Sequence, residues 1–278
     1  MRRLYRPAVH LIAAAALALV WPGGTARAAC GDAPGPGVVW NTCQKTSLHL
    51  GGSDLTGARI VATSLSRSDL REAVLRDAVL VRSYLNRALL TGSVLRGADL
   101  TRTEAYRADF ARADLTGAVL VKMVLARAEL PDARLVGADL RKADAGRAVF
   151  AGADLTGADL TKADLSRADL RQATVVDAEA TKAALIRADL RGANLTGTDL
   201  SDAHLILADL RGARLDGVKV SGALLRHADF SGTDLSGVRG LGAVELNRAC
   251  GDAKTRLPDG LERPDAWPCD PIDRDDGT

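Results

Sequence analysis

The sequence predicts an all-β fold, a parallel β-helix in which each coil has four short sides. From Leu50 to Leu235 every fifth residue is apolar, which gives 38 positions without an insertion, and 29 of them are Leu. The residue two places before these positions is usually small: 27 of the 38 are Ala, and the bulky departures are Leu48, Met123 and Val218. A five-residue period fits neither the 3.6-residue period of an α-helix nor the alternation of a strand. It therefore indicates a short extended segment followed by a corner, repeated as a solenoid.

The outward-facing positions set the number of five-residue units in one coil. We expect the Leu and the small residue to point inward and the other three residues to point outward. The residue two places after each central apolar position, followed from 82 to 187, repeats its character every four units. Thirty-eight units at four per coil make about nine and a half coils, and coils stacked at the ~4.8 Å strand spacing make a rod about 45 Å long.

The repeated unit is Ala-Asp-Leu-x-x, as at residues 153–157 and 188–192. It resembles the consensus of the pentapeptide-repeat family, Ala-(Asp/Asn)-Leu-x-x, over roughly residues 47–240. The resemblance implies a right-handed quadrilateral β-helix of about nine coils. The handedness is implied by the family alone and does not follow from the period.

The first 28 residues are expected to lie outside this fold. Three of the first six residues are Arg, residues 11–20 are apolar, and residues 26–28 are Ala-Arg-Ala. This pattern is typical of a secretory signal peptide with cleavage after Ala28, which predicts a secreted or extracytoplasmic protein. The apolar run is short for a membrane span. The alternatives are a buried N-terminal helix and a lipid anchor on Cys30.

The four Cys agree with export, because none has metal-ligand spacing and disulfides persist in oxidising compartments. Cys30 and Cys43 precede the repeat, whereas Cys250 and Cys269 follow it. Of the three connectivities, we favour Cys30–Cys43 and Cys250–Cys269, because the coils between them hold the two ends apart.

The ends of a solenoid expose unpaired strand edges, so they need caps. We assign residues 29–46 to an N-terminal cap, 47–240 to the β-helix, and 241–278 to a C-terminal cap with an irregular acidic tail.

Composition excludes a disordered polyelectrolyte. The 278 residues are 47% hydrophobic, 3% aromatic and 26% charged, with a formal net charge of +2. Removal of residues 1–28 takes away four of the 37 Lys and Arg and none of the 35 Asp and Glu, which leaves a net charge of −2.

We predict no enzymatic activity, and therefore no catalytic residue, metal or cofactor. The expected mature chain holds three His, and the separation of His204 and His227 is not a whole number of coils, so these two do not stack. No Gly-rich phosphate loop, nucleophile elbow or Cys/His metal set is present. The Asp residues before each Leu belong to the repeat, so they are poor candidates for an acid–base pair.

Charge placement supplies the functional hypothesis. Two columns of cations recur once per coil at neighbouring corners and border one side of the rod, whose other outward positions supply only three acids. Like charges stacked about 4.8 Å apart repel by ~0.9 kcal/mol per pair even in water, so a repeat without a ligand is expected to mix signs. We call this set of cations the basic flank: Arg67, Arg82, Arg87, Arg102, Arg107, Lys122, Arg127, Lys142, Arg147, Lys162, Arg167, Lys182 and Arg187.

Acids also form a column, on another side, but that column is compensated. Asp169, Asp189, Asp209 and Asp229 stack there, and an Arg follows two places after each of the first three. We expect salt bridges along these strands, which make an ordinary solvated surface in which each pair contributes little.

The leading hypothesis is a secreted scaffold whose basic flank binds an extracellular polyanion, such as a cell-wall polymer, lipid headgroups or nucleic acid. One alternative is that the cations only keep the rod soluble. Another is a protein-interaction module, with a partner on an end coil or on the side with Gly corners. Some members of the family imitate DNA and inhibit gyrase, but export, a near-neutral charge and a basic flank argue against that activity here.

Overall fold

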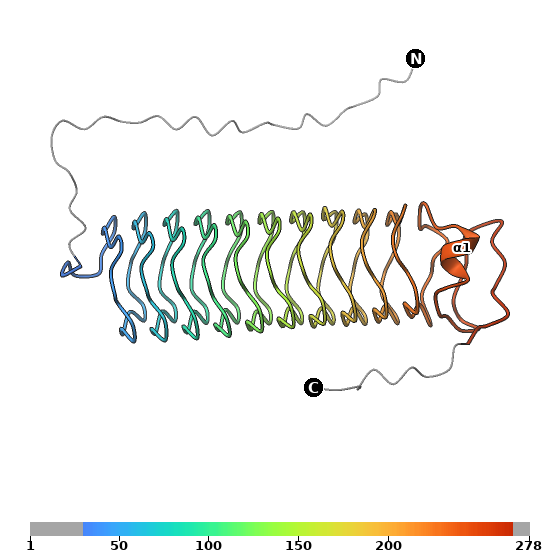
Figure 1. Ribbon diagram of the computed structural model, residues 1–278, viewed down its shortest axis with the longest axis horizontal. Helices are drawn as coiled ribbons and strands as arrows, with labels where there is room; N and C mark the ends of the chain where they lie inside the picture. The colour runs from blue at the N-terminus through green and yellow to red at the C-terminus, as the bar shows by residue number, and fades with distance from the viewer. Residues whose placement is uncertain (1–29, 269–278) are drawn as a thin grey trace, which may run out of the picture.

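The computed structural model describes residues 30–268, which form one rod with its coils stacked along the long axis (Figure 1). The one helix in this part of the chain is α1, Ala243–Leu246, near the C-terminal end. The expected signal peptide, Cys269 and the acidic tail lie outside the described residues.

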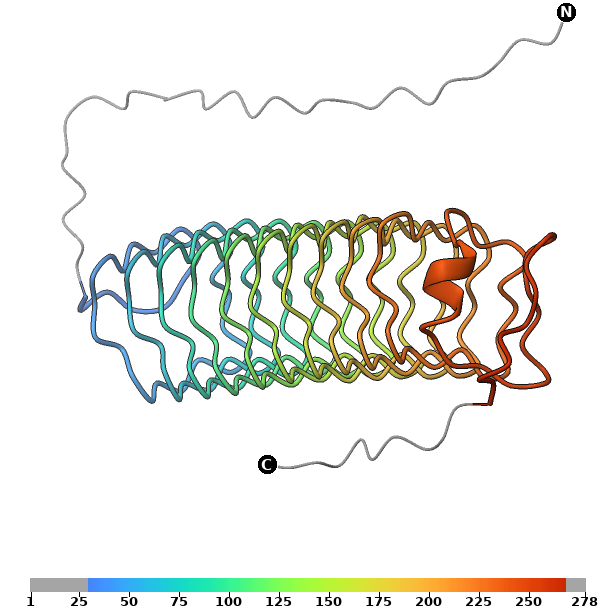
Figure 2. The same cartoon turned by 45° about the vertical axis from the view of Figure 1, so that its right-hand side comes forward.

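Parallel bridges join the outward residue just before each central position to its equivalent four units later, so one coil contains four five-residue units as predicted. The ladder through Asp139 starts at Val39 and reaches Arg239 in ten equal steps, and three further ladders run beside it. Viewed obliquely, the coils superimpose into a tube with a continuous wall (Figure 2). Each bridge residue has a corner on either side, because a two-residue turn follows the central residue of every unit.

The inward positions form a narrow core made of one large and one small side chain per unit. Leu155 and Ala153 are both 0% exposed, and Phe110 and Phe150 occupy the same kind of position as Leu155. Hydroxyl residues at the small position remain hydrogen-bonded, since Thr103 Oγ1 donates to the carbonyl of Leu80 in the preceding coil at 2.6 Å. The interior is therefore too tight for many rings, which explains the low aromatic content.

The corners explain why the repeat prefers Asp before Leu. In the turn that begins at Leu155, the amide of Ala158 donates to the Leu155 carbonyl at 3.0 Å, and Gly157 has φ +65°. A positive φ at the third residue is the requirement of a type II turn. The side chain of Asp154 accepts the amide of Thr156 at 3.1 Å, which satisfies a donor that the coil ladder does not use.

The N-terminal end is part of the solenoid earlier than the sequence indicated. Bridges begin at Val39, within the segment 29–46 that we assigned to a cap. Trp40 is 0% exposed and occupies the inward position two units before Leu50. The predicted Cys30–Cys43 disulfide is present, with a Cα–Cα distance of 5.5 Å. The first coil is thus closed by an aromatic side chain and a cross-link.

The C-terminal end continues the coil with longer excursions of the chain. Asp229 pairs with Cys250 and Asp234 with Arg256, so the regular spacing lengthens by one position and then by two, and α1 lies in the first excursion. The Trp267 indole donates to the Ala249 carbonyl at 2.8 Å. The predicted Cys250–Cys269 pairing involves Cys269, which lies outside the described residues.

Candidate anion-binding flank

The two cationic columns border a single strip of the wall. That strip is the unbroken bridge ladder from Gln44 to Leu224, which includes Tyr84, Asp144 and Asp164. In every coil that carries both cations, one cation lies two places before the bridge residue of the strip and the other lies three places after it. The structure therefore brings all the predicted cations to the two edges of one side of the rod.

All 13 cations occupy the corner position with a positive φ. Arg127 has φ +58° and Lys162 has φ +60°, in the left-handed region that costs a residue with a Cβ roughly 1–2 kcal/mol. Gly meets this demand at the other two corners of many coils, for example Gly152 and Gly157. The sequence thus places Lys and Arg where the backbone favours Gly, and it does so along two neighbouring columns.

The flank is exposed and largely without counter-charges. All of its side chains are exposed except Arg187, which is half-buried. Within the part of the chain that the structure describes, only Lys182 has an ion pair, at 4.0 Å from Asp202. The Arg107 guanidinium lies 5.3 Å from the centre of the Tyr106 ring.

Three carboxylates lie on the strip itself, those of Glu104, Asp144 and Asp164. Two of them accept backbone amides at the neighbouring corner, Asp144 from Gly146 at 3.2 Å and Asp164 from Ser166 at 2.9 Å. These two acids therefore serve the turns of the repeat, and the cations on either side outnumber the three carboxylates.

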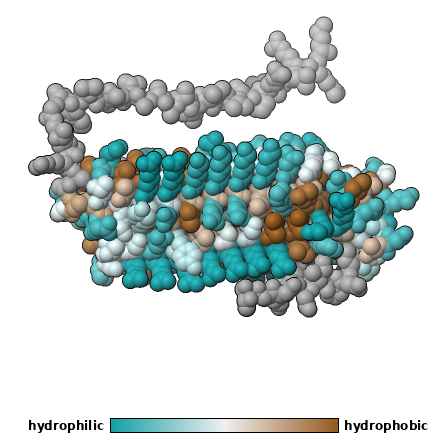
Figure 3. Space-filling view, viewed as in Figure 1, coloured by the Kyte–Doolittle hydropathy of each residue, from teal (hydrophilic) through white to brown (hydrophobic). Residues whose placement is uncertain are grey.

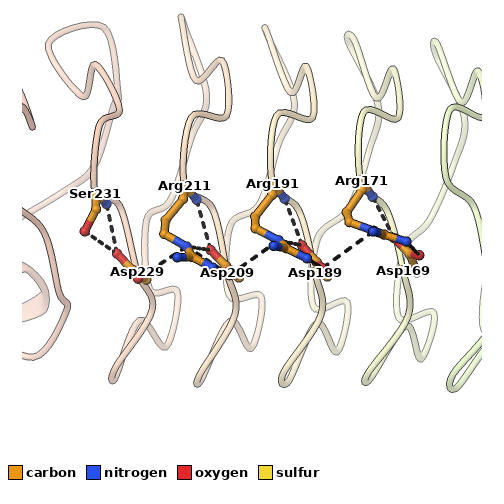
Figure 4. A network of polar contacts seen from close by, with 8 residues as sticks. All are labelled: Asp169, Arg171, Asp189, Arg191, Asp209, Arg211, Asp229 and Ser231. Carbon is orange, nitrogen blue, oxygen red and sulfur yellow. Dashed lines mark hydrogen bonds and ion pairs between the residues drawn. The ribbon is translucent and has the colours of Figure 1, made fainter. Parts of the chain in front are cut away.

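The Asp–Arg ladder on another side differs from the flank because every cation in it is paired (Figure 4). Arg171 contacts Asp169 within its own strand at 2.6 Å and Asp189 in the next coil at 3.8 Å. Arg191 and Arg211 repeat both contacts, so charges of opposite sign alternate along the axis. Sequence reasoning predicted the pairs within each strand but not the second contact across coils.

The pairing lowers the pKa of the carboxyls that take part in it. Hydrogen bonds from the Arg71 side chain, and then from its backbone amide, lower the pKa of Asp69 to about 2. The Arg171 side chain similarly lowers the pKa of Asp169, and burial of that carboxyl opposes the shift. These carboxylates act as fixed negative partners in a structural network, which leaves them without an acid–base role near neutral pH.

One feature at the C-terminal end of the strip was missed from the sequence. The strip ends at Leu224, which is 45% exposed and lines a hollow of about 300 Å³ with Ile206 and Val244. Figure 3 shows hydrophobic side chains gathered near the C-terminal end of the rod, beside long hydrophilic rows. The five-residue pattern could have revealed Ile206 and Leu224, because both are apolar at outward positions. It could not reveal that Val244 of α1 lies beside them, because α1 follows no repeat.

The described residues contain no other arrangement that suggests chemistry. Among residues 30–268, no group of three or more His, Cys, Asp or Glu could hold a metal ion. His204 lies on the strip, and His227 lies at a corner three places beyond Leu224. None of the helices in this range is long and apolar enough to cross a membrane.

A family model described as pentapeptide repeats matches the chain in eight copies, which include residues 53–92, 68–104, 83–120, 108–144, 133–172, 183–222 and 203–239. Among solved structures, HetL, a pentapeptide repeat protein involved in heterocyst differentiation regulation from the cyanobacterium Nostoc sp. strain PCC 7120, is 33% identical. The match covers 77% of this chain and 91% of HetL, with a TM-score of 0.37.

QnrB1, a plasmid-mediated fluoroquinolone resistance protein, is 21% identical over 76% of this chain and 94% of its own, with a TM-score of 0.44. A pentapeptide repeat protein from the Arabidopsis thaliana thylakoid lumen is 31% identical over 41% of this chain and 68% of its own, with a TM-score of 0.22. No curated protein matches the chain.

Proposed function

The chain belongs to the pentapeptide repeat family, and on that premise we propose that it is an exported, non-enzymatic scaffold whose basic flank binds a polyanion. We take its coil to be right-handed, which is the hand of the family. The observation that supports the proposal best is the placement of 13 cations at strained corners along one side of the rod. Within the described residues, only one of these cations, Lys182, has an ion pair.

Unpaired cations in straight rows are suited to a linear anion. Successive cations of one column lie one coil apart, about 4.8 Å, so a chain of phosphates or carboxylates laid along the axis meets a charge in every coil. Binding of this kind is driven by the release of counterions and weakens steeply with salt. The aromatic residues near the flank, Tyr84 and Tyr106, are too few to stack a series of bases, which favours a polymer without bases over nucleic acid.

Export is supported by two independent features. The N-terminal sequence has the three-part pattern of a signal peptide, and the Cys30–Cys43 disulfide fits an oxidising compartment. The ligand is then a polyanion of the cell envelope or the surrounding medium.

The proposal is tested by retention on immobilised polyphosphate at low and high salt. Reversal of Arg107, Arg127, Arg147 and Arg167 to Glu is expected to abolish retention at low salt, and high salt is expected to release the unchanged chain. The matched control makes the same change of charge on exposed residues outside the flank: Arg59, Arg76, Arg112 and Arg134. Equal retention of the two variants, or retention that salt does not alter, would show that the flank only keeps the rod soluble.

A protein-interaction module is the second candidate, favoured by the small corners opposite the flank. Gly97, Gly117, Gly137 and Gly157 leave one edge of that side without side chains over four consecutive coils, where a partner could approach the wall closely. The other edge carries Glu72, Arg112 and Gln172 among its Gly residues. Light scattering after size exclusion separates the candidates in one respect, because a discrete dimer at all salt concentrations favours a self-association surface over an anion site.

A further inference from the structure

We propose that the polyanion is the surface of an anionic phospholipid bilayer, on which the rod lies along its basic flank with the hollow at the C-terminal end receiving lipid chains. This inference rests on the proposed function, since the same cations of the flank contact the headgroups. What it adds is a source for the anion and a role for the apolar side chains of that face.

Apolar residues are exposed on the strip near the start of the cationic columns and again two coils beyond their end. Tyr84 is 42% exposed near one end and Leu224 is 45% exposed at the other, and the ladder that joins them passes through Val124 and Ala184. A soluble, hydrophilic polymer gains little from contact with these side chains. A bilayer offers headgroups to the cations and hydrocarbon to the apolar residues, and both contacts are made on one plane.

The hollow next to Leu224 has the composition of a site for an anionic amphiphile. It is lined by Ile206, Leu225 and Val244, the last of which is 61% exposed, and by three charged residues: Arg226, Arg248 and the acid Glu245. Its volume is about 300 Å³. Apolar walls beside two guanidinium groups, which outnumber the single carboxylate of Glu245, match a lipid chain attached to a phosphate. Leu224 belongs both to the hollow and to the end of the strip, two coils beyond the last cations of the flank.

Charge on this face favours an anionic surface in spite of the carboxylates on the strip. Four acids, Glu104, Asp144, Asp164 and the Lys182 partner Asp202, stand against 13 cations. The carboxylates of Asp144 and Asp164 are held by backbone amides at the neighbouring corner. Attraction to an anionic leaflet adds up over basic residues near the surface and fades within a Debye length of about 10 Å. The two columns lie at the edges of the strip, so both lie within that range when the strip faces the bilayer.

The test is co-sedimentation of the purified chain with vesicles of phosphatidylcholine alone or mixed with phosphatidylglycerol. We expect binding to the mixed vesicles only. Replacement of Leu224 and Val244 by Asn together is expected to lower the vesicle partition coefficient about tenfold while retention on polyphosphate stays the same. Both side chains are exposed, so the fold tolerates the change. The matched control is Leu89→Asn, a residue that is 39% exposed on another side of the rod, and it should leave partition unchanged.

The outcomes separate this inference from the function on which it rests. Retention on polyphosphate that depends on the flank, combined with no binding to either kind of vesicle, would overturn the bilayer and leave a soluble polyanion as the ligand. Vesicle binding that is equally strong in the unchanged chain and in the variant with both Leu224→Asn and Val244→Asn would also overturn it. Loss of both polyphosphate and vesicle binding would reject the proposed function itself.

Discussion

At the scale of single residues, the corner with a positive φ decides what the repeat can display. Among the described residues, many that are not Gly adopt this conformation, and every cation of the flank is one of them. Because each bears a backbone cost that Gly avoids, their concentration in two columns requires a compensating advantage. At these positions the backbone conformation therefore favours Gly, whereas the charge of the surface depends on Lys or Arg.

This conflict predicts the effect of Arg127→Gly. The substitution removes a cation at φ +58°, so we expect the free energy of unfolding to stay constant or rise by up to about 1 kcal/mol, after the entropy of Gly in the unfolded chain is counted. Arg134→Gly is the control, since Arg134 lies in a bridge position. This substitution should lower the free energy of unfolding by about 0.5–1 kcal/mol. Urea unfolding measures both. Equal losses would show that the corner is not strained.

The lowered pKa of Asp69 predicts a loss of stability in acid. Its pKa in the folded chain is about 2, below the usual value near 4, chiefly because the Arg71 side chain donates to the carboxylate. Its contribution is complete above pH about 4 and disappears as the pH falls through about 2. We expect the free energy of unfolding to fall in this window and to fall less in Asp69→Asn. A parallel decline in both proteins, measured by urea unfolding, would contradict this assignment.

At the scale of the coil, stability depends on one large inward side chain per unit. The four inward positions of a coil meet at the axis, and their neighbours are the same positions one coil above and below. A void made there can be filled only by movement of stacked coils, which the backbone ladder resists.

Phe150→Ala tests this view of the core. Phe150 is 0% exposed, and its truncation should cost about 3–5 kcal/mol because the cavity stays open. Leu89→Ala on the outer wall should cost less than about 1 kcal/mol. The comparison is made by chemical unfolding followed by circular dichroism. Similar costs for the two substitutions would mean that the interior relaxes around the void.

Much of the element structure was predictable because the repeat never changes length. The five-residue period predicted the coil, and the class of outward residues predicted its four sides. The same period could have placed Trp40 in the core, as it lies two units before Leu50, but Lys45 interrupts the series. The longer excursions that pair Asp229 with Cys250 could not be predicted, since their spacing follows no repeat.

At the scale of the whole molecule, the near-zero net charge conceals a sorted surface. One side presents cations that are largely unpaired, another holds alternating Asp and Arg, and the two most exposed of the large apolar residues, Leu224 and Val244, lie near the C-terminal end. The sorting of the cations was evident from their spacing of one coil. The cross-coil contacts of the Asp–Arg ladder and the hollow beside α1 were not, because they depend on side-chain reach and on a cap without periodicity.

If the flank is a binding surface, the affinity of the chain for a polyanion must fall with salt, and the salt dependence of affinity tests this most directly. Titration of the chain with soluble polyphosphate at several salt concentrations yields the slope of log affinity against log salt. Reversal of Arg107, Arg127, Arg147 and Arg167 to Glu should reduce the steepness of that slope by about four, one for each lost contact. The same slope in both proteins would contradict the account.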